Sequence, residues 1–156
     1  MKIQISQKIL LLLKKDQSIR EEYWKDKTPE NLEKMKDVDR KNRKEFKKIL
    51  QEYKYIGIEY GREVQEAAFL LVQHLPKADI SSMKKYLLQM KKHRKDVSPN
   101  HIALLTHRIR SWEGKKQYYG TQFTYLNEEY ILKPIWNAKD VDNRRKLLGL
   151  EYILHL

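Results

Sequence analysis

Residues 4–30, QISQKILLLLKKDQSIREEYWKDKTPE, decide the fold class of this chain. Their apolar side chains recur at helical steps, which is the spacing of one face of an amphipathic α-helix. Those side chains are Ile5, Ile9, Leu12, Leu13, Ile19 and Tyr23. The stretch ends in Thr28-Pro29-Glu30, where threonine can cap a helix, proline suits its first turn and an acid follows. The sequence therefore predicts a helix over residues 4–23 and a second helix that starts at Thr28.

The same helical spacing continues toward the C-terminus. Gly57 and Gly61 bracket a break, after which a third helix runs until Pro76, because proline cannot continue a helix. A fourth helix follows, and Ser98-Pro99 opens a fifth. The chain is thus predicted to be mostly helical.

The spacing changes between residues 117 and 135. Tyr, Thr, Phe and Ile, which favour strands, cluster there around a turn at Asn127-Glu128, which predicts a hairpin or two short extended segments. A last short helix is predicted to end at Gly149. We expect a mainly α, compact single domain over residues 1–156, with about six helices and a small β-hairpin near the C-terminus.

Composition narrows the classes of function. The chain of 156 residues has no cysteine, which excludes disulfides, thiolate metal sites and cysteine nucleophiles. The apolar run from Ile9 to Leu13 is too short for a signal-peptide core or a membrane span, which favours a cytoplasmic protein without membrane contact. No motif for a metal or a cofactor is evident, so neither is expected.

The charge of the chain is +12, and it is concentrated in one region. Residues 77–116 hold eleven Lys and Arg against three acids, a local charge of +8. One side of the predicted fourth helix carries a lysine stripe, which can follow a phosphate backbone or can simply be a solvated face. The stripe is Lys84, Lys85, Lys92 and Lys95. Binding of nucleic acid or of an acidic partner is therefore one alternative, although 24 of the basic residues are Lys and only 9 are Arg.

Several polar residues fall on or beside the apolar faces of the predicted helices. His74 follows Leu71 by three residues, so it lies on or beside the apolar face of the third helix. There it can be a catalytic acid, base or ligand, or a hydrogen-bonded histidine that closes the helix. Asp16, Asp39 and Asn42 are expected where the first two helices meet. The leading interpretation is a polar core network in which the acids pair with Arg20, Arg108 or Arg145, because an unpaired buried charge is costly.

A second group of candidates lies in the C-terminal half. Gln117, Tyr119, Thr121 and Gln122 have amide, phenol and hydroxyl groups that can contact a ligand, or the amides can tie down neighbouring backbone. Strand-like alternation would place the first three on one face. Arg108 and Arg145 fall on apolar helical faces. There they can bind an anion or form ion pairs with the inward acids Asp16 and Asp39. The ligand-contact candidates are Gln73, Gln117, Tyr119, Thr121, Gln122, Arg144 and Arg145.

Taken in order, six short motifs resemble one bacterial domain family of unknown function over nearly the whole chain. The motifs are Asp16-Gln17 with Arg20, Asp39 with Asn42, Leu71-Val72-Gln73-His74, Leu105-Thr106-His107-Arg108, Gly114 to Gln122, and Val141-Asp142 through Arg144-Arg145 to Leu148-Gly149-Leu150. The resemblance implies a compact, mostly helical domain and carries no assigned activity. The family pattern has an aspartate where this chain has His107, so an acid is missing at that position.

The sequence supports one leading hypothesis and two alternatives. The leading hypothesis is a domain that binds a small molecule or a peptide in a polar pocket, with hydrolysis as a further step. We expect His74 to be the catalytic base and Arg108 or Arg145 to stabilise negative charge, with Gln117 and Gln122 also lining the pocket. The alternatives are binding of nucleic acid or an acidic partner through residues 77–116, and a purely structural or interaction role.

Overall fold

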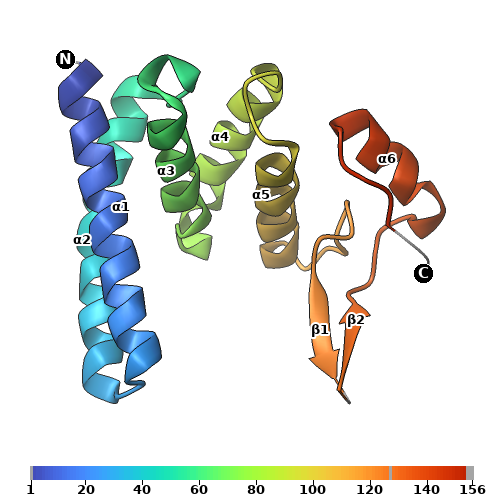
Figure 1. Cartoon of the computed structure of the whole chain (residues 1–156), viewed down its shortest axis with the longest axis horizontal. Helices are drawn as coiled ribbons and strands as arrows, with labels where there is room; N and C mark the ends of the chain where they lie inside the picture. Colours follow the sequence, from blue (N-terminus) through green and yellow to red (C-terminus); the bar gives the residue numbers. More distant parts are fainter. Residues whose placement is uncertain (1, 127, 154–156) are drawn as a thin grey trace. The chain divides into compact units, whose positions relative to one another are not determined.

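The computed structural model describes residues 2–126 and 128–153, and it confirms the predicted mainly helical fold with a small hairpin near the C-terminus (Figure 1). The chain divides into two compact units, residues 1–76 and residues 77–156, and each is described by itself. The first unit holds α1 (Lys2–Lys25), α2 (Pro29–Tyr53), the short 3-10 helix η1 (Ile58–Tyr60) and α3 (Arg62–Gln73). The second holds η2 (Lys77–Asp79), α4 (Ile80–Lys92), α5 (Pro99–Trp112), β1 (Phe123–Leu126), β2 (Glu129–Leu132), η3 (Ala138–Asp140) and α6 (Val141–Leu148).

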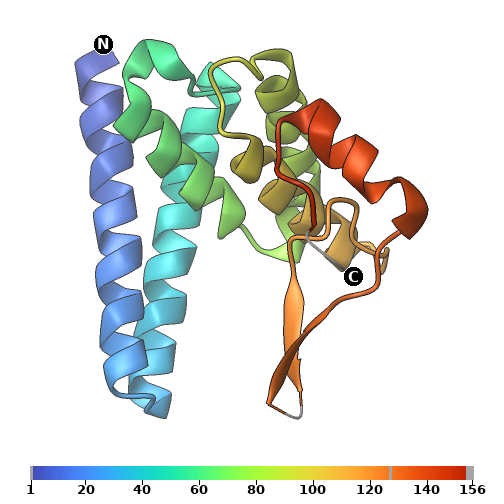
Figure 2. The ribbon, with the colours of Figure 1, turned by 45° about the vertical axis from the view of Figure 1, so that its right-hand side comes forward.

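In the first unit, α1 and α2 form an antiparallel pair (Figures 1 and 2). The predicted helix start after Thr28 is confirmed, since its hydroxyl oxygen accepts a hydrogen bond of 3.3 Å from the backbone N–H of Asn31. Helix α1 is two residues longer at each end than the predicted range 4–23. Apolar residues of both helices are buried between them and α3; they are Ile9, Leu12, Ile19, Phe46 and Ile49. Of the six apolar residues that the sequence places on one face of the first helix, Ile9, Leu12 and Ile19 are buried, and Ile5, Leu13 and Tyr23 are half-buried.

Helix α3 packs against α1 and ends just before His74. Ala67 and Ala68 are buried on it, and small side chains of this kind let two helix backbones approach closely. The backbone N–H of His74 donates to the carbonyl of Leu70, which closes the helix two residues before Pro76. The predicted stop at Pro76 is thus confirmed, and it places His74 at the C-terminal end of α3.

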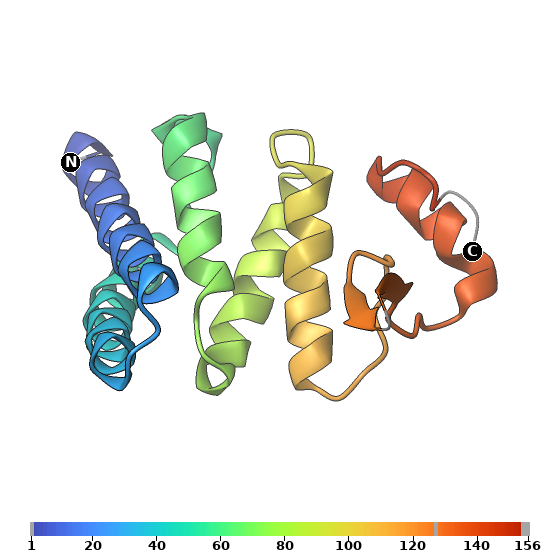
Figure 3. The ribbon, with the colours of Figure 1, turned by 60° about the horizontal axis from the view of Figure 1, so that its bottom comes forward.

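In the second unit, α4 and α5 lie side by side (Figure 3). Their shared core is apolar, and it includes Met83, Tyr86, Met90, Ile102, Ala103 and Leu105. Helix α6 ends at Gly149, whose φ of +88° is the left-handed conformation that favours glycine, as the sequence predicts.

No helix in the described part of the chain is long and apolar enough to cross a membrane.

Strands β1 and β2 pair antiparallel, with Phe123 opposite Leu132 and Leu126 opposite Glu129. The predicted hairpin is confirmed, although Asn127 of its predicted turn lies outside the described residues. Figures 1 and 2 show the hairpin extending away from α6, and every side chain of β1 is exposed.

The predicted strand alternation over residues 117–122 is wrong, because this segment precedes β1 and forms a loop. Gly120 in the loop has a φ of +64°, which a residue with a side chain adopts at a cost. A Cβ atom at Gly120 would lie 3.0 Å from Cδ1 of Ile135 and would also meet Ile153. The loop therefore needs glycine here both for its conformation and for close packing.

Candidate functional site

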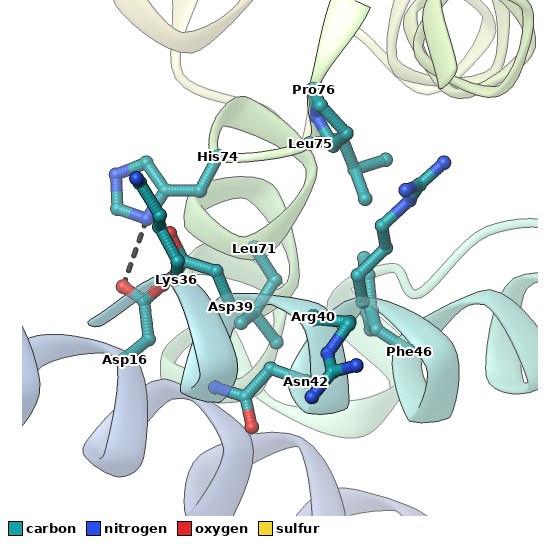
Figure 4. A pocket seen from close by; sticks show the side chains of 11 residues that line it. Asp16, Lys36, Asp39, Arg40, Asn42, Phe46, Leu71, His74, Leu75 and Pro76 are labelled. Carbon is teal, nitrogen blue, oxygen red and sulfur yellow. Dashed lines mark hydrogen bonds and ion pairs between the residues drawn. The ribbon is translucent and has the colours of Figure 1, made fainter. Parts of the chain in front are cut away.

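The centre of the candidate site is a contact between His74 at the end of α3 and Asp16 in α1. Nδ1 of His74 lies 2.8 Å from Oδ2 of Asp16, across 58 residues of sequence (Figure 4). The Asp16 side chain is only 3% exposed, whereas that of His74 is 25% exposed. Within the described residues, Nε2 of His74 has no protein partner. One ring nitrogen is thus held by a buried carboxylate, on a side chain that is a quarter exposed.

Arg20 links Asp16 to Asp39 of α2. Its NH1 group donates to Oδ1 of Asp16 at 2.6 Å and to Oδ1 of Asp39 at 3.0 Å, and its NH2 group donates to Oδ2 of Asp39 at 3.3 Å. Gln17 donates a further hydrogen bond of 2.8 Å to Oδ2 of Asp16. The buried carboxylate of Asp16 therefore has an arginine, an amide and an imidazole around it, as a buried charge requires.

The fourth member of the predicted polar network, Asn42, has a separate role. Its amide Nδ2 donates to the backbone carbonyl of Leu12 at 3.0 Å, so it joins α2 to α1. The structure therefore brings Asp16, Arg20 and Asp39 into one ion network, and Asn42 fixes the same helix pair nearby.

A cavity of about 240 Å³ borders this network inside the first unit (Figure 4). Part of the cavity wall is apolar, and part of it is charged. The lining residues are Asp16, Lys36, Asp39, Arg40, Asn42, Arg43, Phe46, Leu71, His74, Leu75 and Pro76. Cavities for drug-sized ligands hold about 300–1,000 Å³, so this one suits a small molecule or the end of a larger one.

Three cations of α2 line the cavity, and sequence reasoning did not single them out. They are Lys36, Arg40 and Arg43. Lys36 pairs with Glu33 at 2.7 Å and Arg40 pairs with Asp37, both between exposed groups three residues apart. Exposed ion pairs of this kind are weak in water, so Lys36 and Arg40 can turn toward an anion. Their spacing of four and three residues places them on one helical face, which is the signal that could have identified them.

Three buried polar atoms in the described ranges 2–126 and 128–153 have no hydrogen-bond partner. They are Oε1 of Gln73, Nδ1 of His107 and Oγ1 of Thr121. All three residues belong to the motifs that the sequence analysis quotes. An unsatisfied buried group costs about 1–3 kcal/mol, and proteins retain few of them. A ligand or water that paired with these atoms would remove that cost.

Gln117 in the second unit is buried, and its amide holds the loop together. Oε1 accepts hydrogen bonds from the backbone N–H groups of Thr121 at 2.8 Å and Gln122 at 3.0 Å. Nε2 donates to the carbonyls of Gln122 at 3.1 Å and Lys133 at 2.6 Å. Every polar atom of this amide is therefore used by backbone, which is the structural alternative left open by the sequence.

Arg144 and Arg145 also bind backbone carbonyls. The buried guanidinium of Arg144 donates to the carbonyls of Tyr118, Trp136 and Asn137 at 2.7–3.1 Å. Arg145 donates to those of Glu151 at 2.5 Å and Tyr119 at 2.6 Å. Through these hydrogen bonds both arginines hold the backbone in place, which is a structural role. Ligand contact by either arginine stays a prediction.

Arg108 lies in α5 with its guanidinium carbon 5.4 Å from the ring centre of Trp112, and burial lowers its pKa. Burial also lowers the pKa of the neighbouring His107, with smaller contributions from Lys133 and Arg108. Tyr119 is buried, which raises the pKa of its phenol. The predicted pocket combined His74 with Arg108, Gln117, Gln122 and Arg145, and the structure places His74 in the first unit and the other four in the second.

The lysine stripe of α4 is exposed, as a solvated face would be. Lys84 forms an ion pair with Glu113, and Lys115 pairs with the same carboxylate at 2.9 Å. These two hydrogen bonds lower the pKa of Glu113 to about 2. Lys85 and Lys92 are exposed along the same helix, whereas Lys95 is exposed in the turn that follows it, because α4 ends at Lys92. In the part of the chain that the structure describes, no three His, Asp or Glu side chains gather as a metal site would need.

The comparison with known families gives one match. The sequence pattern of a family of unknown function, DUF6624, matches residues 3–155. The chain belongs to this family. The matched range extends over both units of the structure and contains the positions of the His74–Asp16 network and of the loop around Gln117. No curated protein and no solved structure matches the chain.

Proposed function

We propose that this DUF6624 protein binds a small anionic molecule in the cavity of its first unit and hydrolyses an ester or phosphoester bond with His74 as the general base. The observation that carries the proposal is the 2.8 Å contact between Nδ1 of His74 and the buried carboxylate of Asp16 beside that cavity. A histidine held on one nitrogen by a carboxylate is the usual arrangement of a base in hydrolytic enzymes.

The orientation of His74 follows from the ion network. Asp16 is paired with Arg20, and an ionised carboxylate can only accept a hydrogen bond. When the imidazole is neutral, its hydrogen bond to this carboxylate requires the proton on Nδ1 and leaves the lone pair on Nε2. Because Asp16 cannot move far from Arg20, the ring is held in one orientation before a substrate binds.

The reaction needs no covalent intermediate on the protein. Nε2 of His74 takes a proton from a water molecule as the water oxygen bonds to the acyl carbon or phosphorus of the substrate. The bond to the leaving oxygen then breaks, its electron pair stays on the leaving group, and the imidazolium returns the proton to that oxygen. The positive charge on the imidazolium is stabilised meanwhile by Asp16 at 2.8 Å.

The cations of the cavity supply the reason for an anionic substrate. Lys36, Arg40 and Arg43 outnumber the two acids of the lining, and Arg20 already binds both of those acids. Arginine forks match the geometry of phosphate and carboxylate oxygens. A terminal carboxylate of a peptide has the same chemistry, so a peptide end is an equivalent ligand for this cavity. In this proposal Arg40 takes the charge-stabilising role that the sequence analysis gave to Arg108 or Arg145.

The test is hydrolysis of two anionic compounds, p-nitrophenyl phosphate and the mono-p-nitrophenyl ester of succinate, by the wild-type protein and by His74→Gln. Glutamine can still donate a hydrogen bond to Asp16, so the fold should be kept. Loss of a general base lowers turnover by about 10²–10⁴-fold. The matched control is His93→Gln, the same change at an exposed histidine of the second unit, which should leave turnover unchanged. Retained turnover in His74→Gln, or no wild-type turnover with either compound, would contradict the catalytic proposal.

A further inference from the structure

A second surface, independent of the His74 cavity, combines an exposed and a half-buried aromatic ring with cations. It consists of Arg110, Lys115, Lys116, Tyr118 and Trp136, which line a shallow depression of about 460 Å³ in the second unit. The Trp136 side chain is 48% exposed although it is large and apolar. We refer to these five residues as the Tyr118–Trp136 surface.

The two rings of this surface are held in a fixed arrangement. Tyr118 and Trp136 stack with their ring centres 5.5 Å apart and their planes 14° apart. The guanidinium carbon of Arg144 lies 4.6 Å from the Tyr118 ring centre and 5.3 Å from that of Trp136. Because Arg144 is buried and also binds the backbone carbonyls of both aromatic residues, the rings cannot separate easily. The stacked pair is a rigid platform.

Cations surround the platform. Arg110 lies with its guanidinium carbon 5.4 Å from the Tyr118 ring centre, and its Nε donates to the carbonyl of Lys116 at 2.8 Å. Lys115 pairs with Glu113, which also binds Lys84. The five surface residues themselves include three cations and no acid. Positive charge beside an exposed ring face is the combination found in proteins that bind single-stranded nucleic acids.

We infer that the Tyr118–Trp136 surface binds single-stranded nucleic acid, with a base stacked on Trp136 and phosphates near Arg110, Lys115 and Lys116. A base of a single strand exposes its flat face to an aromatic ring, whereas a base inside a duplex is already stacked on its neighbours. An acidic peptide would match the cations but would leave the ring face of Trp136 without a stacking partner. The geometry therefore favours a single strand over either of these.

The surface differs from the lysine stripe on α4. That stripe is a row of exposed lysines, and one of them, Lys84, is bound to Glu113. The nucleic-acid alternative of the sequence analysis is thus placed on Arg110 to Trp136 rather than on Lys85, Lys92 and Lys95.

The experiment is a fluorescence anisotropy titration of a labelled oligothymidylate of about 12 nucleotides with the full chain. Trp136→Ala should weaken binding by roughly tenfold, because stacking of one base contributes that order of affinity. Trp136→Phe keeps an aromatic face and should restore most of it, which separates stacking from loss of the fold. The matched control is Trp24→Ala, since Trp24 is 66% exposed and has the Lys27 ammonium 4.5 Å from its ring centre.

The charge contribution is tested by the salt dependence. The double variant Lys115→Gln with Lys116→Gln should reduce the slope of log affinity against log salt by about 0.7 per charge removed, whereas Lys92→Gln with Lys95→Gln should not change it. The inference is overturned if the oligothymidylate does not bind, if Trp24→Ala weakens binding as much as Trp136→Ala, or if a duplex or poly-glutamate binds as tightly as the single strand.

Discussion

Replacement of Arg20 by methionine should lower the free energy of unfolding by about 3 kcal/mol, because it leaves the buried carboxylate of Asp16 without its arginine. Methionine keeps much of the apolar stem of the side chain, so the loss reports mainly on charge and hydrogen bonds. His74 and Gln17 remain beside Asp16 and compensate only in part. Urea unfolding of the two proteins measures the difference.

Two further variants make this prediction specific. Asp16→Asn combined with Arg20→Met should cost much less than the sum of the single changes, because the neutral amide no longer needs a cation. Arg40→Met, the same change at a side chain that is 77% exposed, should have a far smaller effect than Arg20→Met. Equal losses in Arg20→Met and Arg40→Met would show that the Asp16 network does not stabilise the fold.

Replacement of Gln117 by alanine should lower the free energy of unfolding by about 2–3 kcal/mol, because four hydrogen bonds to backbone are lost at a buried position. The N–H groups of Thr121 and Gln122 would lose their acceptor. Hydrogen exchange of these two amides should therefore become faster than in the wild-type protein.

The matched control is Gln122→Ala, an amide in the same loop whose side chain makes no hydrogen bond among the described residues. It should change stability by about 0.5 kcal/mol or less. If Gln117→Ala left the exchange of residues 121 and 122 unchanged, the structural role of Gln117 would be wrong, and its alternative role as a ligand contact would regain support.

The helices could be predicted because their signals are local. Thr28-Pro29-Glu30 marks a helix start within three residues, and Pro76 marks a stop by itself. The loop over residues 117–122 could not be predicted in the same way. Its shape depends on a hydrogen bond from Gln117 to the carbonyl of Lys133, which lies 16 residues later. The alternation of side chains between neighbouring residues cannot reveal a contact over that separation.

The sequence predicted which types of residue form the candidate site, but it predicted only part of how those residues are arranged. The pairing of Asp16 with Arg20 follows a helical step of four residues. The contact between Asp16 and His74 joins positions 58 residues apart, so only the fold reveals it. Lys36 and Arg40 of α2 were missed because each has an acidic neighbour on its own helix and therefore resembles an ordinary solvated charge.

The most direct test of the central claim is an NMR titration of the histidine imidazole signals with orthophosphate, with acetate in a parallel series. We predict that the Nε2 signal of His74 shifts and saturates with at least one of these anions while the signal of His93 does not. The same titration of Arg40→Met should need several-fold more anion. An unchanged His74 signal with both anions, or equal shifts at His93, would contradict an anion site beside the His74–Asp16 pair.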